Sequence, residues 1–385
     1  MKGAPSKNLD ELVESGVVQL TRGKVISKRD ISACPGHFPV YSSAKENDGK
    51  FGEYGLFMFD EELITWSVDG GGRLFHRPKH RFSVTNVGGV LRILDKSLLD
   101  YKYLYYALSL RHSEIAFDWV KKAHPSVIRK LYQDIPVPSI PEQQRIVGIL
   151  DEAFEGIATA KANAEKNLQN ARALFESHLQ SVFTQRGKGW VERRLKDVCE
   201  KITDPTHQTP TYFDKGVVFL SSRNVTSGRM NWENIKYIDA KQHLAMHKRV
   251  APRVNDILLA KNGTTGVAAI VDRDVTFDIY VSLALLRATT EILPQLLLHF
   301  INSPVAKHQF NKRLKGIGVP NLHLEEIREV VISFPKSLAG QKELAAKLDD
   351  LRGETQRLES IYQRKLAALE SLKKSLLHQA FTGQL

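Results

Sequence analysis

The sequence of 385 residues predicts an α+β fold class, with two globular domains separated by two long helices that form an antiparallel coiled-coil spacer. Three observations lead to this prediction. A stretch in the middle of the chain is repeated at its end, both copies have the apolar spacing of a helix, and the excess positive charge lies outside them. The expected limits are 1–138 for the first domain, 139–185 for the first helix, 186–337 for the second domain and 338–385 for the second helix.

The repeat aligns the two helical stretches at a constant offset of 198 positions, without gaps. Ten of 47 aligned residues are identical, from Ser139 and Ser337 at the start to a shared Phe-Thr pair near the end. Two unrelated helices give a few chance matches, but a gapless match over this length indicates a duplication. The alternative is a single helical hairpin within one core. We disfavour it because each helix follows a separate globular segment.

Apolar and small residues follow the 3–4 spacing of a coiled-coil seam in both copies. The second seam is rich in leucine and the first in alanine, so large side chains of one helix can fill the space beside small ones of the other. Gly148 and Gly156 weaken the first helix by up to ~1 kcal/mol each, so packing must hold it. The expected seam consists of Leu150, Ala153, Ile157, Ala160 and Ala164 in the first helix, and Leu348, Leu351, Leu358, Tyr362 and Leu369 in the second.

The two globular segments share a weaker order of elements. Each contains a strand that ends in two serines, at 38–43 and 217–222, and a later strand that enters a glycine turn, at 62–72 and 256–266. A helix-like apolar run, a basic loop with a proline and a final strand follow in each segment. Each half is therefore predicted to be an α+β domain that ends in a long helix. The helix-like runs are Tyr101–Leu110 and Leu293–Ile301, and the final strands are 135–138 and 330–335.

The formal net charge is +12, and it is concentrated in the globular segments. Residues 1–138 carry an excess of four positive charges and residues 186–337 an excess of eight, whereas the helices nearly cancel. A basic surface is the usual footprint of nucleic-acid binding. No run approaches the roughly 18 apolar residues of a membrane span, and the N-terminus lacks the apolar core of a signal peptide. Cys34 and Cys199 fit no metal or disulfide pattern, which favours thiols in a reducing cytoplasm.

Taken together, these features resemble the specificity subunit of type I restriction–modification systems. The helix start Ile140–Val147 looks like the central repeat of that family, and Ser375–Leu385 looks like its C-terminal repeat. The segment Asp256–Gly266 is similar to a recurrent element of the family's target-recognition domains. The resemblance covers nearly the whole chain. The first half departs from the pattern, with a glycine triplet at 70–72 where Gly-Thr-x-Gly is common.

The resemblance implies that each globular segment is a target-recognition domain reading one half of a split double-stranded DNA target. It implies that the helices set the gap between the half-sites, that methyltransferase subunits dock on the repeats, and that a motor-nuclease subunit joins for cleavage. S-adenosylmethionine and ATP belong to those partners, so no cofactor and no catalysis are expected of this chain. A solitary DNA-binding regulator that dimerises through its helices is the alternative. A coiled-coil adaptor without sequence preference is a third hypothesis.

Candidate DNA contacts lie in the basic loops of both domains. Arginine and asparagine can bond bidentately to guanine and adenine, whereas lysine more often neutralises phosphate. The alternative for each residue is an ordinary solvated charge. The candidates are Arg73, Arg77, Lys79, Lys121, Lys122 and His124 in the first domain, and Ser222, Arg223, Asn224, Lys261, Asn262, Thr264, Lys312, Arg313, Lys315 and Asn321 in the second.

The sequence predicts neither a catalytic nor a metal site. Its glycine-rich segments lack the spacing of a dinucleotide site or a P-loop. Asp48-Gly49-Lys50 and Asp239-Ala240-Lys241 resemble the last part of a nuclease metal site, but nothing upstream completes one. His207, His243 and His247 could suggest a metal site, yet no second cluster accompanies them, which favours ordinary surface or core histidines.

Overall fold

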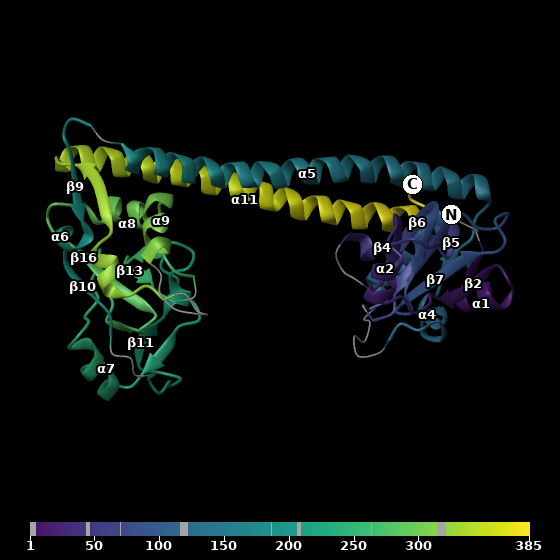
Figure 1. The fold of residues 1–385 in the computed structure, drawn as a ribbon, viewed down its shortest axis with the longest axis horizontal. Helices are drawn as coiled ribbons and strands as arrows, with labels where there is room; N and C mark the ends of the chain where they lie inside the picture. The colour runs from purple at the N-terminus through teal and green to yellow at the C-terminus, as the bar shows by residue number, and fades with distance from the viewer. Residues whose placement is uncertain are drawn as a thin grey trace. The chain divides into compact units, whose positions relative to one another are not determined.

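The computed structural model describes residues 5–43, 47–69, 71–115, 122–185, 187–205, 209–262, 264–313 and 321–385. The chain divides into two compact units: unit 1 comprises Met1–Ala164 and Arg364–Leu385, and unit 2 comprises Glu165–Gln363. Two 45-residue helices, α5 (Ile140–Thr184) and α11 (Leu338–Thr382), each contribute one part to each unit (Figure 1). The predicted fold class is therefore confirmed. The described part of the chain contains no helix long and apolar enough to cross a membrane.

Unit 1 is built on a six-stranded sheet in the order β2-β7-β5-β6-β3-β4. Its pairings are antiparallel except that between β3 and β6, which is parallel. A short pair, β1 with β8, connects the start of the unit to the segment before α5. The strands are β1 (Ser6–Lys7), β2 (Val18–Arg22), β3 (Phe38–Tyr41), β4 (Lys50–Tyr54), β5 (Phe59–Ser67), β6 (Leu74–Val84), β7 (Gly88–Ile93) and β8 (Ile135–Pro136). The helices are α1 (Leu9–Glu14), α2 (Lys28–Ala33), the 3₁₀ turn η1 (Asn47–Gly49), α3 (Tyr101–Glu114) and α4 (Pro125–Leu131).

The core of unit 1 lies where the sheet meets α3, α4 and the long helices. Trp66 and Tyr103 are among its largest fully buried side chains, and Leu150 of α5 is also fully buried. Phe381 of α11 packs against Tyr103 with ring centroids 5.2 Å apart. Burial of such side chains stabilises each by about 1.5–3 kcal/mol, so α3 ties both long helices to the domain.

Unit 2 contains a four-stranded sheet, β10-β16-β13-β14, and a three-stranded sheet, β12-β11-β15. A further antiparallel pair joins β9 to β17, next to the start of α11. The strands are β9 (Trp190–Arg194), β10 (Cys199–Thr203), β11 (Val217–Leu220), β12 (Lys236–Ile238), β13 (Ile257–Ala260), β14 (Ala268–Ile270), β15 (Phe277–Ile279), β16 (Leu283–Ala288) and β17 (Val331–Pro335). The helices are α6 (Leu195–Val198), the 3₁₀ turn η2 (Ser222–Asn224), α7 (Ala240–His247), α8 (Pro294–Ile301), α9 (Pro304–Arg313) and α10 (Leu324–Arg328).

The two units share one strand arrangement. The antiparallel series β2-β7-β5-β6 of unit 1 corresponds to β10-β16-β13-β14 of unit 2. The parallel pair β3-β6 corresponds to β11-β15, and each is flanked by an antiparallel strand, β4 or β12. Unit 2 therefore has two short strands, β14 and β15, where unit 1 has the single strand β6. The similarity of the globular segments predicted from sequence is confirmed at the level of topology.

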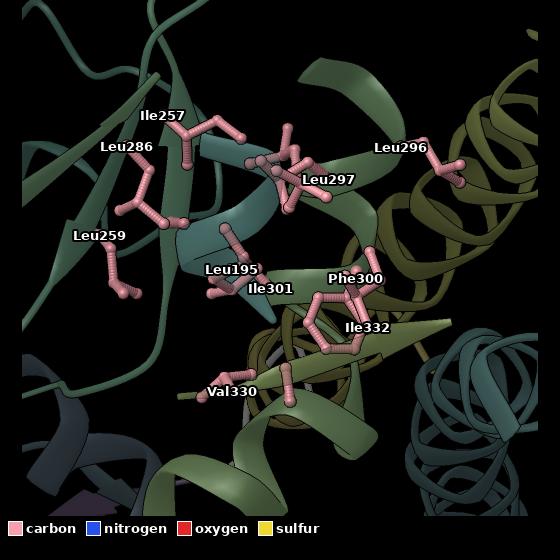
Figure 2. Packing of buried hydrophobic residues seen from close by; sticks show 14 of the residues in the cluster. Leu195, Ile257, Leu259, Leu286, Leu296, Leu297, Phe300, Ile301, Val330 and Ile332 are labelled. Atoms are coloured by element: carbon pink, nitrogen blue, oxygen red, sulfur yellow. The ribbon is translucent and has the colours of Figure 1, made fainter. Parts of the chain in front are cut away.

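Figure 2 shows the principal core of unit 2, where α8 and β17 pack against the four-stranded sheet. Leu259 and Leu286 of neighbouring strands lie at one side of this core. On α8, Ile301 lies beside Leu195, and Phe300 lies beside Ile332 of β17. Phe183 of α5 packs edge-on against Phe300, with ring centroids 5.3 Å apart. The end of α5 thus enters the core of unit 2 much as the end of α11 enters the core of unit 1.

Within each unit the portions of α5 and α11 run antiparallel. Lys161 pairs with Glu370 at 2.6 Å in unit 1, and Arg172 pairs with Glu359 at 2.9 Å in unit 2. All ten residues of the predicted seam are buried or partly buried, and Leu150, Ala164 and Leu348 are fully buried. Leu174 and Leu372, which occupy equivalent repeat positions, are instead 55% and 46% exposed. The apolar stripe is therefore wider than the surface that the helices bury.

Candidate nucleic-acid interface

The glycine turns of the two units close with the same pattern of backbone hydrogen bonds, although the turn of unit 2 is one residue longer. In unit 1 the turn connects β5 to β6, and the Gly72 N–H donates to the carbonyl of Ser67 over 3.1 Å. In unit 2 it connects β13 to β14, and the Gly266 N–H donates to the carbonyl of Ala260 over 3.0 Å. Both glycines have left-handed backbones, with φ of +73° and +85°, which strains other residues. The turns therefore close in the same way although unit 1 lacks the Gly-Thr-x-Gly sequence.

A second segment is held beside each glycine turn. We call these the pre-helix segments, 122–124 in unit 1 and 321–323 in unit 2. The Ala123 N–H donates to the carbonyl of Val68 over 2.8 Å, and the Leu322 N–H donates to that of Lys261 over 3.1 Å. Each segment then ends in a histidine that starts a helix: His124 precedes α4, and His323 precedes α10.

Lys122 and Asn321, both candidates from the sequence, occupy equivalent positions, because each directly precedes the residue that makes this hydrogen bond. Lys122 forms an ion pair of 3.2 Å with Asp69 of its glycine turn. Asn321 forms an antiparallel bridge with Asn262 of its own turn. Among the described residues, the side-chain carbonyl oxygens of Asn262 and Asn321 are buried without a hydrogen-bond partner. Each unit thus presents polar side chains from two adjoining loops.

A third loop adds a pocket of about 620 Å³ in unit 2. It follows β11, where the Ser222 N–H donates to Ser282 Oγ over 3.0 Å. Arg223 is exposed at the pocket, whereas Asn224 is buried and holds the loop by a hydrogen bond to the carbonyl of Asn231 at 3.0 Å. The pocket therefore combines one exposed guanidinium with hydroxyl and amide groups that can donate and accept hydrogen bonds.

Two of the candidate cations are buried and engaged with their own domain. The Arg77 Nε donates to Thr65 Oγ1 over 3.0 Å, and its guanidinium lies 3.5 Å from the centre of the Tyr41 ring. Burial lowers the pKa of Arg77 to about 10. Lys261 is 4% exposed and forms an ion pair with Asp204. A buried, paired charge cannot reach a ligand without breaking that pair, so these side chains hold the loops in place.

The remaining candidates differ in position. Arg73 is exposed at the end of its glycine turn and lies 5.1 Å from the Phe75 ring. Lys79 is exposed in the middle of β6, and no hydrogen bond or ion pair among the described residues joins it to either loop. Thr264 is exposed in the second glycine turn, and Lys312 is exposed on α9. Arg313 is the last residue of α9, and Lys121 and Lys315 lie outside the described residues.

Sequence reasoning missed three residues of these surfaces. Tyr212 and Lys236 line the unit 2 pocket, and the Lys236 ammonium lies 3.8 Å from the centre of the Tyr212 ring. Their sequence neighbourhoods carry no basic cluster that could have drawn notice. His323 could have been found, because it matches His124 in preceding a short helix.

The two Asp-x-Lys triplets have local structural contacts. The Asp239 side chain accepts the Gln242 N–H over 2.7 Å and caps α7. Asp48 has a left-handed backbone, with φ of 50°, and its carbonyl accepts a hydrogen bond from Arg77.

The two cysteines are free thiols. Cys199 is buried, and burial raises the pKa of its thiol to about 12, whereas Cys34 is partly exposed.

The chain matches the family described as the type I restriction modification DNA specificity domain twice, over residues 5–169 and 187–366. It is 27% identical over 338 residues to a putative type I specificity subunit of Mycoplasma pneumoniae, with 87% of each chain covered. It is 23% identical over 379 residues to the specificity subunit of the type I restriction enzyme MjaVIII of Methanocaldococcus jannaschii, covering 91% of this chain and 86% of that one.

Two solved structures share the fold. One comes from work on the complex assembly and conformational transition of the type I R–M system. It has a TM-score of 0.72 and 16% identity, with 96% of this chain and 98% of that chain covered. The other is the HsdS subunit from Thermoanaerobacter tengcongensis, with a TM-score of 0.55 and 16% identity over 100% of this chain and 98% of that chain. At this level of identity both likenesses concern the fold.

Proposed function

This chain belongs to the type I restriction–modification DNA specificity family, and from this premise we propose that it reads a bipartite double-stranded DNA target and docks methyltransferase subunits. The observation that carries the proposal is the repeated arrangement of loops. Each unit sets a glycine turn beside a pre-helix segment by an equivalent backbone hydrogen bond. Two equivalent loop sites in one chain suit two half-sites of one target.

The polar residues of these loops that are exposed or partly exposed are the proposed DNA contacts. In unit 1 they are Arg73, Lys122 and His124, with Lys79 of β6 as a further phosphate contact. In unit 2, Arg223 and Asn321 suit base edges, whereas Thr264 and Lys312 suit the backbone. Arg77, Asn224 and Lys261 support the loops from within. Because lysine contacts displace counterions from DNA, binding should weaken steeply as salt rises.

The long helices act as the spacer in this proposal. Each helix has 45 residues and contributes to both units. A change in helix length therefore changes the length of the segment that joins the two target-recognition domains. Repressor dimers fix the separation of their half-sites in a comparable way.

The internal duplication also suits two copies of one partner. Similar surfaces on the two repeats would let two identical methyltransferase subunits bind, and a motor-nuclease subunit would join the same assembly. Catalysis and the binding of S-adenosylmethionine and ATP belong to those partners in this proposal. The chain itself acts as a DNA-recognition subunit in the cytoplasm.

Methylation-site mapping tests this function. Cells would carry the chain with its cognate methyltransferase subunit, and matched cells would lack either one. We expect a split, asymmetric methylated motif that requires both proteins, and that changes in one half when one globular domain is replaced by that of a relative. A defined DNA footprint of the purified chain without any methylated motif would favour a solitary regulator instead.

A further inference from the structure

We propose that unit 2 holds a divalent transition-metal ion of the zinc class between His243 and His247 of α7 and Asp278 of β15. His243 Nδ1 lies 2.7 Å from Asp278 Oδ2, and His247 Nδ1 lies 3.0 Å from Oδ1 of the same carboxylate. One ligand atom from each residue falls within 4.8 Å of the other two. Within the described ranges no other group of histidine, cysteine and carboxylate side chains meets this condition.

The geometry suits three protein ligands around a small ion. Two histidines four residues apart lie on one face of a helix, so both imidazoles can turn toward one point. Zinc binds imidazole nitrogen and carboxylate oxygen at about 2.0–2.2 Å, which separates neighbouring ligands by roughly 3.3 Å in a tetrahedron. The two nitrogen–oxygen separations of 2.7 and 3.0 Å would have to open by about 0.6 and 0.3 Å to reach this value. The fourth position would be taken by water, as in other three-ligand zinc sites.

The chemistry of the donors selects the ion. Imidazole suits zinc, cobalt, nickel and copper, whereas magnesium and calcium prefer sets made only of oxygen. Asp278 is 1% exposed, and a buried carboxylate requires compensation. Among the described residues the two imidazoles are the partners of this carboxylate, and no lysine or arginine there pairs with it. A bound cation would neutralise this charge directly.

Comparison of the two units shows that the fold does not need this carboxylate. The Thr85 N–H donates to the carbonyl of Tyr41, and the Tyr280 N–H donates to that of Leu220, both over 2.8 Å. Counting back two residues from each places Ser83 of unit 1 at the position of Asp278. Ser83 donates to the carbonyl of Leu56, and no histidine among the described residues pairs with it, so the His–His–Asp cluster is an addition specific to unit 2.

The ion would anchor a helix that has little apolar anchorage. Met246 is the buried residue of α7, while Leu244 on the same helix is 71% exposed. From α7, Gln242 exchanges two hydrogen bonds with the backbone of Thr211, at 2.8 and 3.0 Å, next to Tyr212 of the pocket. A metal ion that fixes α7 to β15 would therefore fix one wall of the pocket.

The test uses the full, untagged chain, stripped with chelator and then supplied with Zn²⁺ or Co²⁺. We expect one ion per chain by elemental analysis after dialysis, visible d–d bands typical of four-coordinate Co²⁺, and a melting temperature that falls when chelator is added. The His243→Asn/His247→Asn double variant should lose all three signals. His308→Asn, which alters an exposed histidine of α9, should keep them.

Asp278→Asn removes the third ligand and should also abolish binding of the ion. If this substitution of a buried residue prevents folding, the single His243→Asn variant takes its place. Retention of the ion with unchanged Co²⁺ bands in the double variant would overturn the proposal. So would a folded native chain that retains no ion after dialysis, which would leave a hydrogen-bonded cluster. None of these measurements involves DNA, so the outcome is independent of the proposed function.

Discussion

Gln143 and Gln341, which lie 198 positions apart, make the same three hydrogen bonds in their respective units. Gln143 Oε1 accepts the Asp100 N–H at 2.9 Å, and its Nε2 donates to the carbonyls of Leu98 and Pro138. Gln341 Oε1 accepts the Leu293 N–H at 2.9 Å, and its Nε2 donates to the carbonyls of Glu291 and Pro335. Both side chains are fully buried. Each glutamine ties the start of a long helix to the start of the domain helix, α3 or α8.

Replacing either glutamine should destabilise its own unit. Gln143→Ala leaves the Asp100 N–H and two carbonyls without their side-chain partner in a buried place, which should cost about 2–4 kcal/mol of unfolding free energy. Gln341→Ala should cost a similar amount in unit 2. Chemical unfolding of the full chain measures both. Gln144→Ala and Lys342→Ala alter exposed neighbours and should change stability by less than about 0.5 kcal/mol. Equal effects at buried and exposed positions would contradict this account.

The sequence predicted those parts of the fold that are encoded locally. The helix limits followed from the gapless repeat, and the strands that enter the glycine turns correspond to β5 and β13. The interruption between β14 and β15 was not predicted, because short strands separated by a polar loop carry a weak periodic signal.

Burial of individual site residues could not be predicted in the same way. Lys261 is paired with Asp204, 57 positions away, and Arg77 with the carbonyl of Asp48, 29 positions away. No sequence pattern distinguishes Asp204 or Asp48 as the partner. Likewise, the sequence pattern marked His243 and His247 but not Asp278, which lies 35 and 31 positions away from them and meets them only in the folded chain.

Arg223 offers the most direct test of base reading. It is exposed at the unit 2 pocket, so Arg223→Ala should weaken binding by about 1–3 kcal/mol and relax one base position in one half of the target. Methylation mapping of the variant complex gives the base preference, and titration with labelled duplex gives the affinity. Arg253→Ala removes the same charge from an exposed position that does not line the pocket and should leave the motif unchanged. An unaltered preference in Arg223→Ala would remove this residue from the contacts that read bases.

His299 should make the stability of unit 2 depend on pH. Its ring nitrogen lies 2.7 Å from Asp349, yet burial dominates and lowers its pKa below the usual value of about 6.5. As pH falls through that value the unfolded chain takes up a proton that the folded chain resists, so stability is lost on acidification. We expect the melting temperature to fall between pH 7.5 and 5.5 by less in His299→Gln than in the native chain. His308→Gln is the exposed control, and identical pH slopes for native and His299→Gln chains would refute the assignment.

Lengthening both long helices should widen the gap in the DNA target. The change inserts seven residues that keep the heptad pattern after Lys166 in α5 and after Tyr362 in α11. These insertions preserve the facing seams and add about 10 Å to each helix. At roughly 3.4 Å per base pair the methylated motif should gain about three unspecified positions between unchanged half-sites. The same insertion in α5 alone mismatches the paired seams and should reduce methylation without producing a new defined motif. A doubly lengthened chain that methylates the original motif would show that the helices do not set the spacing.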